Sequence, residues 1–175
     1  MFSSDGTDNF VKRLDRRDDL ARLIVLDTWI RNCDRCHRAF DGVIDYNRDN
    51  LLFESLGNQA YRLAPIDHSH CIIDVGFEDA ELQDATRIRD ENVYGFFPEF
   101  APYIEPDSVA VAVQAMLSVD RPALTEIVNS VPEEWELGER ERVSLVDFLE
   151  KRAQFLADTL PMKLVDRPLL RNFTP

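Results

Sequence analysis

The sequence lacks the features that mark membrane, secreted and disulfide-stabilised proteins. No uninterrupted apolar run approaches the roughly 18 residues that would span a bilayer. The opening residues, MFSSDGTDNF, have neither the basic start and apolar core nor the small-residue cleavage site of a secretory signal. Three cysteines are too few for a disulfide framework in 175 residues and leave free thiols or metal binding as the options. We therefore expect a cytoplasmic protein in a reducing compartment, with no membrane partner.

Basic residues are also scarce. The chain has 20 lysines and arginines against 33 aspartates and glutamates, which gives a net charge of −13. This charge opposes the phosphate neutralisation that drives nucleic-acid binding, so we expect no nucleic-acid partner. Excess carboxylate instead favours divalent cations and basic protein surfaces, although most of it keeps the surface solvated.

The first half of the chain is predicted to contain one helix and one hairpin. Apolar residues recur at helical spacing over 18–33, which predicts a helix buried on more than one side. The polar stretch 34–50 is predicted to be a long loop. Short strands over 51–54 and 60–66 flank a turn at Gly57 and Asn58, which predicts a β-hairpin.

The second half of the chain is predicted to be helical. Four helices are expected, over 78–91, over 106–117, from an Asp120 cap to about Asn129, and over about 139–160. Pro161 is expected to stop the last of them. No internal repeat or linker divides the sequence, so residues 1–175 are predicted to form one domain. The fold class is mainly α with a small β-hairpin (α+β).

Cysteine and histidine fall into two short clusters, which allows two metal-centred interpretations. Cys33, Cys36 and His37 form a C-x-x-C-H motif with the spacing of haem attachment, but that chemistry needs export from the cytoplasm. The same three residues could share a tetrahedral zinc site with the second cluster, because zinc takes four nitrogen or sulfur ligands. The second cluster consists of His68, His70 and Cys71.

A third interpretation uses Asp34, Asn50 and Asp67 together. Phosphoryl transfer needs one carboxylate to orient the attacking hydroxyl, and an asparagine and a second aspartate to hold magnesium against the nucleotide phosphates. In kinase-type lobes these residues occur in a fixed order: a helix, a loop with Asp and then Asn, a short hairpin, and Asp after its second strand. The predicted elements of this sequence follow that order.

The sequence here resembles the HipA-like kinase family and, more distantly, the phosphatidylinositol 4-kinase type. The segments that carry the resemblance are LDTWIRNCDR, DNLLFE and YRLAPIDHSHCI, within residues 25–73. In that family a D-x-W-x-x-N-x-D-R motif precedes an N-L-L strand and an I-D-H or I-D-N segment. A weaker likeness runs through VNSVPEEWELGERERVSLVDFLEKRAQFL, which is similar to the family's closing helices.

The resemblance implies a role for each motif residue. Asp34 corresponds to the catalytic aspartate, and Asn50 and Asp67 correspond to the residues that bind magnesium and ATP. Asn32 and Arg35 are implied to be loop residues that position Asp34. Asp27 and Trp29 are interpreted as packing and anchoring residues of the preceding helix, without a chemical role.

The catalytic loop is longer than the family pattern. Asn50 follows Asp34 by sixteen positions, whereas the protein-kinase signature places them five apart. An insertion is therefore expected around RAFDGVIDY, where Cys36 and His37 could also form a local metal clip. Asn47 is a competing choice for the metal ligand, although Asn50 directly precedes the strand.

The sequence also has no counterpart of the lobe that covers the nucleotide. There is no G-x-G-x-x-G motif, and the only lysines are Lys12, Lys151 and Lys163. Residues 1–14 are too few for a sheet and are expected to be poorly ordered. The resemblance therefore implies a C-terminal kinase lobe alone, with an apolar face exposed beside its catalytic site. We expect that face to be covered by a partner chain that supplies an N-terminal lobe, by a second copy of the chain, or by a segment of the protein outside these 175 residues.

The expected reaction is the transfer of the ATP γ-phosphoryl group to a hydroxyl, on a protein Ser or Thr or on a small molecule. The alternative from a different functional class is a non-catalytic kinase-like or zinc-stabilised interaction module.

Overall fold

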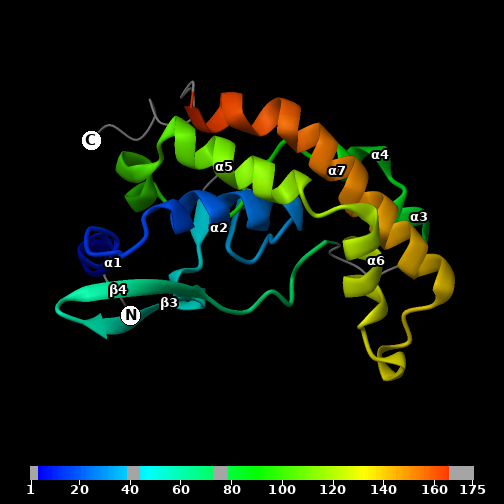
Figure 1. Cartoon of the computed structure of the whole chain (residues 1–175), viewed down its shortest axis with the longest axis horizontal. Coiled ribbons are helices and arrows are strands. Elements are labelled where there is room, and N and C mark those ends of the chain that lie inside the picture. The colour runs from blue at the N-terminus through cyan, green and yellow to red at the C-terminus, as the bar shows by residue number, and fades with distance from the viewer. Residues whose placement is uncertain (1–3, 39–43, 73–78, 166–175) are drawn as a thin grey trace.

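The computed structural model describes residues 4–38, 44–72 and 79–165. Figure 1 shows a stack of helices with the β3–β4 hairpin on one side of it. None of the helices in these ranges combines the length and the apolar content needed to cross a bilayer. The mainly helical α+β class predicted from the sequence is confirmed.

Helix α2 (Asp18–Trp29) is the centre of the core. It packs against α5 (Pro106–Leu117) and α7 (Glu139–Val165) and also contacts β4 (Ala60–Pro65), so it lies between the other helices and the hairpin (Figure 1). Eight of its twelve residues are buried, which agrees with the prediction of a helix buried on more than one side. The predicted end of this helix was too late. It ends at Trp29 because the backbone turns to a positive φ of 51° at Arg31.

A second short pair of strands precedes the hairpin. Strand β1 (Cys36–Arg38) pairs antiparallel with β2 (Ile44–Tyr46), and a 3-10 turn, η1 (Arg48–Asn50), follows. The prediction of a long loop was therefore wrong for the described part of 34–50. Strand β3 (Leu51–Gly57) then pairs antiparallel with β4, which confirms the predicted hairpin.

The segment expected to be poorly ordered contains helix α1 (Ser4–Val11). Val11 is buried, and Phe10 stacks on Phe53 of the hairpin with ring centroids 5.1 Å apart. Leu14 bridges to Tyr61 of β4 in parallel. The first helix therefore packs on the inner face of the hairpin, which also contacts α2.

The helix predicted over 78–91 is two short helices, α3 (Asp79–Leu82) and α4 (Ala85–Ile88). Asp84 separates them because its backbone is extended and its side chain accepts the Thr86 N–H as an N-cap. Residue 78 lies outside the described ranges.

The remaining helices follow the predictions more closely. Helix α5 has the predicted bounds, and α6 (Arg121–Asn129) is capped by Asp120, whose carboxylate accepts the Ala123 N–H at 3.0 Å. Short 3-10 turns, η2 (Pro98–Tyr103) and η3 (Glu133–Trp135), connect the helices.

Helix α7 continues past Pro161 to Val165, so the prediction that this proline ends it was wrong. Leu160 and Leu164 are both buried, and their packing favours a continuous helix despite the missing N–H. One apolar stripe of α7 faces the core, where Val146, Leu149, Ala153, Leu156 and Leu160 are buried. Val143, one turn before this stripe, is exposed.

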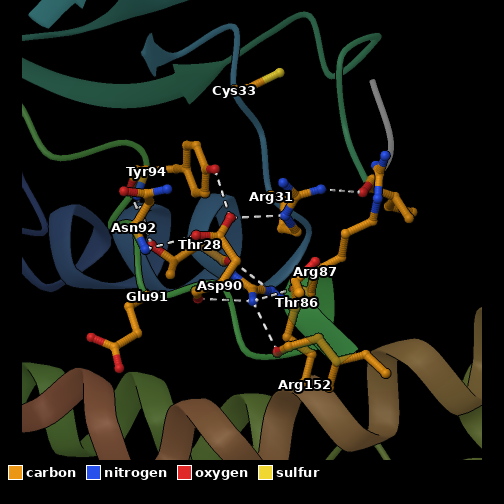
Figure 2. Close-up of polar contacts among 12 residues, drawn as sticks. Thr28, Arg31, Cys33, Thr86, Arg87, Asp90, Glu91, Asn92, Tyr94 and Arg152 are labelled. Carbon is orange, nitrogen blue, oxygen red and sulfur yellow. Dashed lines mark hydrogen bonds and ion pairs between the residues drawn. The ribbon is translucent and has the colours of Figure 1, made fainter. Parts of the chain in front are cut away.

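Arg152 of α7 connects the ends of two other helices (Figure 2). Its guanidinium donates to the carbonyls of Thr28 and Trp29 at the end of α2, at 2.7–3.1 Å. It also donates to three carbonyls at or just after the end of α4, those of Arg87, Ile88 and Asp90. Helix C-termini present unpaired carbonyls with partial negative charge, so one buried cation caps both ends. Burial lowers the pKa of Arg152 to about 10, which leaves the side chain charged at neutral pH.

Asp90 is the centre of a neighbouring polar cluster (Figure 2). Its carboxylate accepts from Arg31 Nε at 2.9 Å, from the Tyr94 hydroxyl at 2.8 Å and from the Asn92 N–H at 2.9 Å. Burial alone would raise the pKa of Asp90, but these three donors outweigh it and lower the pKa.

We expect Arg152→Met to reduce the free energy of unfolding by about 3–5 kcal/mol, because several buried carbonyls would lose their donor. Urea denaturation measures this loss. The matched control is Lys151→Ala, since Lys151 is 57% exposed and lies 4.0 Å from Asp147, and it should change stability by less than about 0.5 kcal/mol. Equal effects of the two variants would show that Arg152 does not cap the helices.

The Asp90 cluster predicts a loss of stability in acid. The folded-state pKa of Asp90 lies below its ordinary value of 3.8, so the unfolded chain binds the proton more tightly. The stabilisation is therefore complete above about pH 5 and disappears as the pH falls through the folded-state pKa. Denaturation curves between pH 3 and pH 6 should show a shallower pH dependence for Asp90→Asn than for the native chain. An identical slope would contradict the lowered pKa.

Candidate active site

A fully buried ion pair lies beneath the loop that follows α2. Arg35 Nε donates to Asp27 Oδ2 at 2.9 Å, and both side chains are 0% exposed. Asn32 Nδ2 donates to the other carboxylate oxygen of Asp27 at 3.0 Å. Burial raises the pKa of Asp27, while the charge and hydrogen bonds of Arg35 and Asn32 act in the opposite direction. The pair fixes the loop to the buried face of α2.

The same arginine holds the two ends of the hairpin together. Arg35 Nη1 donates to the Asn50 carbonyl at 2.6 Å and to the Ile66 carbonyl at 2.9 Å. The Ile66 N–H also donates to the Asn50 carbonyl at 3.0 Å. Asn50 lies directly before β3, and Asp67 directly follows Ile66. One guanidinium therefore brings the predicted asparagine and the segment of the second predicted aspartate to the loop that follows α2.

Asp34 and Asn50 are in direct contact. Asn50 Nδ2 donates to Asp34 Oδ2 at 2.7 Å, and Asn47 Nδ2 donates to the same oxygen at 3.0 Å. An amide nitrogen that donates leaves its carbonyl oxygen free to accept or to bind a cation. The two asparagines that competed in the sequence for one role thus both contact Asp34.

Asp67 lies at the exposed end of this arrangement. Its backbone has a positive φ of 55°, and its carboxylate accepts from the Ser69 hydroxyl at 2.6 Å and from the Ser69 N–H at 3.1 Å. These hydrogen bonds lower the pKa of Asp67, so the carboxylate is charged at neutral pH. A charged carboxylate and an amide oxygen are hard donors of the kind that Mg²⁺ prefers, so Asp67 and Asn50 are the residues that would hold a magnesium ion.

Asn32 and Asp27 contact each other. Asn32 donates to Asp27, so any influence of Asn32 on Asp34 passes through the buried ion pair. Asp27, interpreted as a helix anchor, pairs with Arg35 and so ties α2 to the following loop. The signal in the sequence was an aspartate among the apolar residues of a helix predicted to be buried, because a buried carboxylate needs a charged or hydrogen-bonded partner.

The described thiols point to different neighbours. Cys33 Sγ donates to the His70 carbonyl at 3.3 Å, whereas Cys36 Sγ contacts the Val93 carbonyl at 3.9 Å. Burial raises the pKa of Cys71 to about 12, which disfavours its thiolate. Within the described ranges, no three His, Cys, Asp or Glu side chains are grouped as metal ligands, and the His37 side chain lies outside this set. Zinc binding therefore stays a prediction.

His68 contacts the buried ion pair. Its Nε2 atom lies 3.3 Å from Arg35 Nη2 and 3.9 Å from Asp27 Oδ1. The residue that follows Asp67 therefore contacts the ion pair that anchors the loop after α2.

Apolar residues are exposed on the hairpin next to the site. Leu52 is 48% exposed and pairs with Ala64, and Ile66, two residues further on, is 42% exposed. A cavity of about 480 Å³ opens beside β3. It is lined by Thr7, Phe10, Arg48, Asp49, Leu51, Leu52, Phe53, Glu54 and Ala64. Its size and largely apolar lining are in the range of small-molecule sites.

Comparisons with protein families, with curated proteins and with solved structures found no match to this chain. The geometry of the site is therefore the basis for a functional conclusion.

Gly95 provides a test of the support beneath the site. Its φ is +73°, and an added Cβ would lie 2.6 Å from Asp27 Oδ2. We expect Gly95→Ala to reduce the free energy of unfolding by about 2–4 kcal/mol, through backbone strain and a clash with the buried carboxylate. The control is Gly57→Ala, where φ is +82° but nothing lies within 4 Å of the added Cβ. Equal losses in thermal denaturation would mean that the contact with Asp27 has no effect.

Proposed function

We propose that this chain is the C-terminal lobe of a HipA-like kinase, which transfers the γ-phosphoryl group of ATP to a hydroxyl. The observation that carries the proposal is the hydrogen bond between Asn50 and Asp34, residues sixteen positions apart. Arg35 supports it by holding the backbone of Asn50 beside that of Ile66, the residue before Asp67. These contacts support the proposal, because phosphoryl transfer needs a carboxylate and an asparagine close together on one loop and its following strand.

Each residue has a distinct role in the proposed reaction. Asp34 accepts a hydrogen bond from the acceptor hydroxyl and takes its proton as the hydroxyl oxygen bonds to the γ-phosphorus. The bond from that phosphorus to the bridging oxygen breaks, and ADP leaves with the electron pair. Asn50 and Asp67 would hold Mg²⁺, which would neutralise charge on the phosphate oxygens. The acceptor is a protein Ser or Thr or a small molecule.

The nucleotide and a covering lobe fit the apolar side of the hairpin. The 480 Å³ cavity, beside the strand that begins at Leu51, can take an aromatic base on Leu52 and Ala64. Asp49 and Glu54, which also line the cavity, can accept hydrogen bonds from ribose hydroxyls. The exposed Leu52 and Ile66 side chains offer apolar surface to an N-terminal lobe, supplied as a partner chain or by a second copy. Free thiols and the use of ATP are consistent with a cytoplasmic location.

A non-catalytic kinase-like interaction module is the second candidate. The observation that favours it is that these 175 residues contain neither a glycine-rich phosphate loop nor a lysine in any predicted strand. In that case the hairpin face would bind a partner without phosphoryl transfer.

The test begins with Mn²⁺ as a spectroscopic substitute for Mg²⁺, titrated into the full chain and followed by electron paramagnetic resonance. We expect weak binding that falls at least about tenfold, or about 1.4 kcal/mol, in Asp67→Ala and in Asn50→Ala. Asp107→Ala, which removes an exposed carboxylate from the first turn of α5, should leave the affinity unchanged. Equal Mn²⁺ affinity in all the variants would remove the basis for the kinase site.

Calorimetric titration with ATP·Mg separates a complete kinase from an incomplete one. We expect poor binding and no phosphoryl transfer by the chain alone, because the covering lobe supplies most contacts to ATP. Micromolar binding, or turnover that Asp34→Asn abolishes, would show that these residues suffice without a covering lobe. If the chain binds metal but transfers no phosphoryl group even when a covering lobe is added, the interaction module is favoured.

A further inference from the structure

The second amide on Asp34 has a role of its own. Asp34 Oδ2 accepts from Asn47 at 3.0 Å as well as from Asn50 at 2.7 Å. Asn47 precedes η1, but its side chain makes no capping hydrogen bond there. The Asn47 amide therefore donates to Asp34 and does not cap η1.

The inserted strands deliver Asn47 to this position. The β1–β2 pair aligns Cys36 with Tyr46, so the chain returns to the catalytic loop one residue before Asn47. The Asn47 N–H then donates to the Arg35 carbonyl at 3.1 Å. Because Arg35 is fixed by the buried ion pair, Asn47 is held to the loop through its backbone and its side chain.

We infer that Asn47 is a positioning residue that fixes the carboxylate of Asp34. The inference rests on the proposed function. A carboxylate that takes a proton with one oxygen must keep its orientation, and two donors on the opposite oxygen oppose its rotation. In the proposed reaction Asn50 would have a second duty, because its amide oxygen would hold the metal. Asn47 is assigned no metal there, so its amide would orient Asp34 whether or not metal is bound.

The experiment uses the full chain, with the Asp34 carboxyl carbon observed by carbon-13 NMR and Mn²⁺ affinity measured on the same variants. Asn47→Ala should shift the Asp34 carboxyl resonance and leave Mn²⁺ affinity within about twofold, whereas Asn50→Ala should weaken Mn²⁺ binding by about tenfold. Asn47→Asp, which keeps the size but removes both donors, should shift the resonance as well.

Two controls separate positioning from general destabilisation. Asn129→Ala removes an exposed amide at the end of α6 and should leave the Asp34 resonance unchanged. Val113→Ala trims a buried core residue of α5 and should lower the melting temperature without moving that resonance. An unmoved Asp34 resonance in Asn47→Ala, or a loss of Mn²⁺ affinity equal to that of Asn50→Ala, would overturn the inference. If the native chain binds no Mn²⁺, the proposed function fails, while the resonance still decides whether Asn47 holds Asp34.

Discussion

The site depends on the buried pair of Asp27 and Arg35. Removing both charges from water costs several kcal/mol per ion, and only excellent geometry and further hydrogen bonds offset that cost. Those further bonds are the ones that build the site, because Arg35 also reaches the carbonyls of Asn50 and Ile66. The contacts that satisfy the buried Arg35 guanidinium also join three chain segments, at Asp27, Asn50 and Ile66.

The exposed end of the site is organised differently from the buried end. Among the described residues, the hydrogen bonds to the Asp67 carboxylate come from Ser69, at the surface, where solvent screens its charge. Asp34 lies between the two ends, with one oxygen engaged by amides. Hydrogen-bond support therefore decreases from α2 outward, which suits the proposed roles of a fixed orientation at Asp34 and metal exchange at Asp67.

The sequence was sufficient for elements whose signals are local. Pro106 in a first turn, the Asp120 cap and the Gly57-Asn58 turn each determine nearby backbone geometry, and the corresponding elements have the predicted type and nearly the predicted bounds. Pairing of β1 with β2 depends on contacts between the two ends of the insertion. The alternation of apolar and polar residues in the sequence does not predict such contacts. The continuation of α7 past Pro161 likewise depends on tertiary packing.

The sequence selected candidate site residues by their side-chain chemistry and motif order, and it gave no signal for contacts that end on the backbone. Asp34, Asn50 and Asp67 could be selected because carboxylates and amides in that order have a chemical meaning. Arg152 could not, because all its partners are main-chain carbonyls, and any residue type at those positions would present the same acceptors.

The cap formed by Arg152 cannot form until late in the synthesis of the chain. The loop with Asp34 follows α2, whose final carbonyls are satisfied by a residue made more than 120 positions later. Synthesis runs from the N-terminus, so this loop leaves the ribosome long before the guanidinium that caps its helix. The end of α2 must meanwhile rely on water or on other proteins for its hydrogen bonds. A nascent chain stopped before Arg152 would carry every residue of this loop on a helix whose end has no native cap.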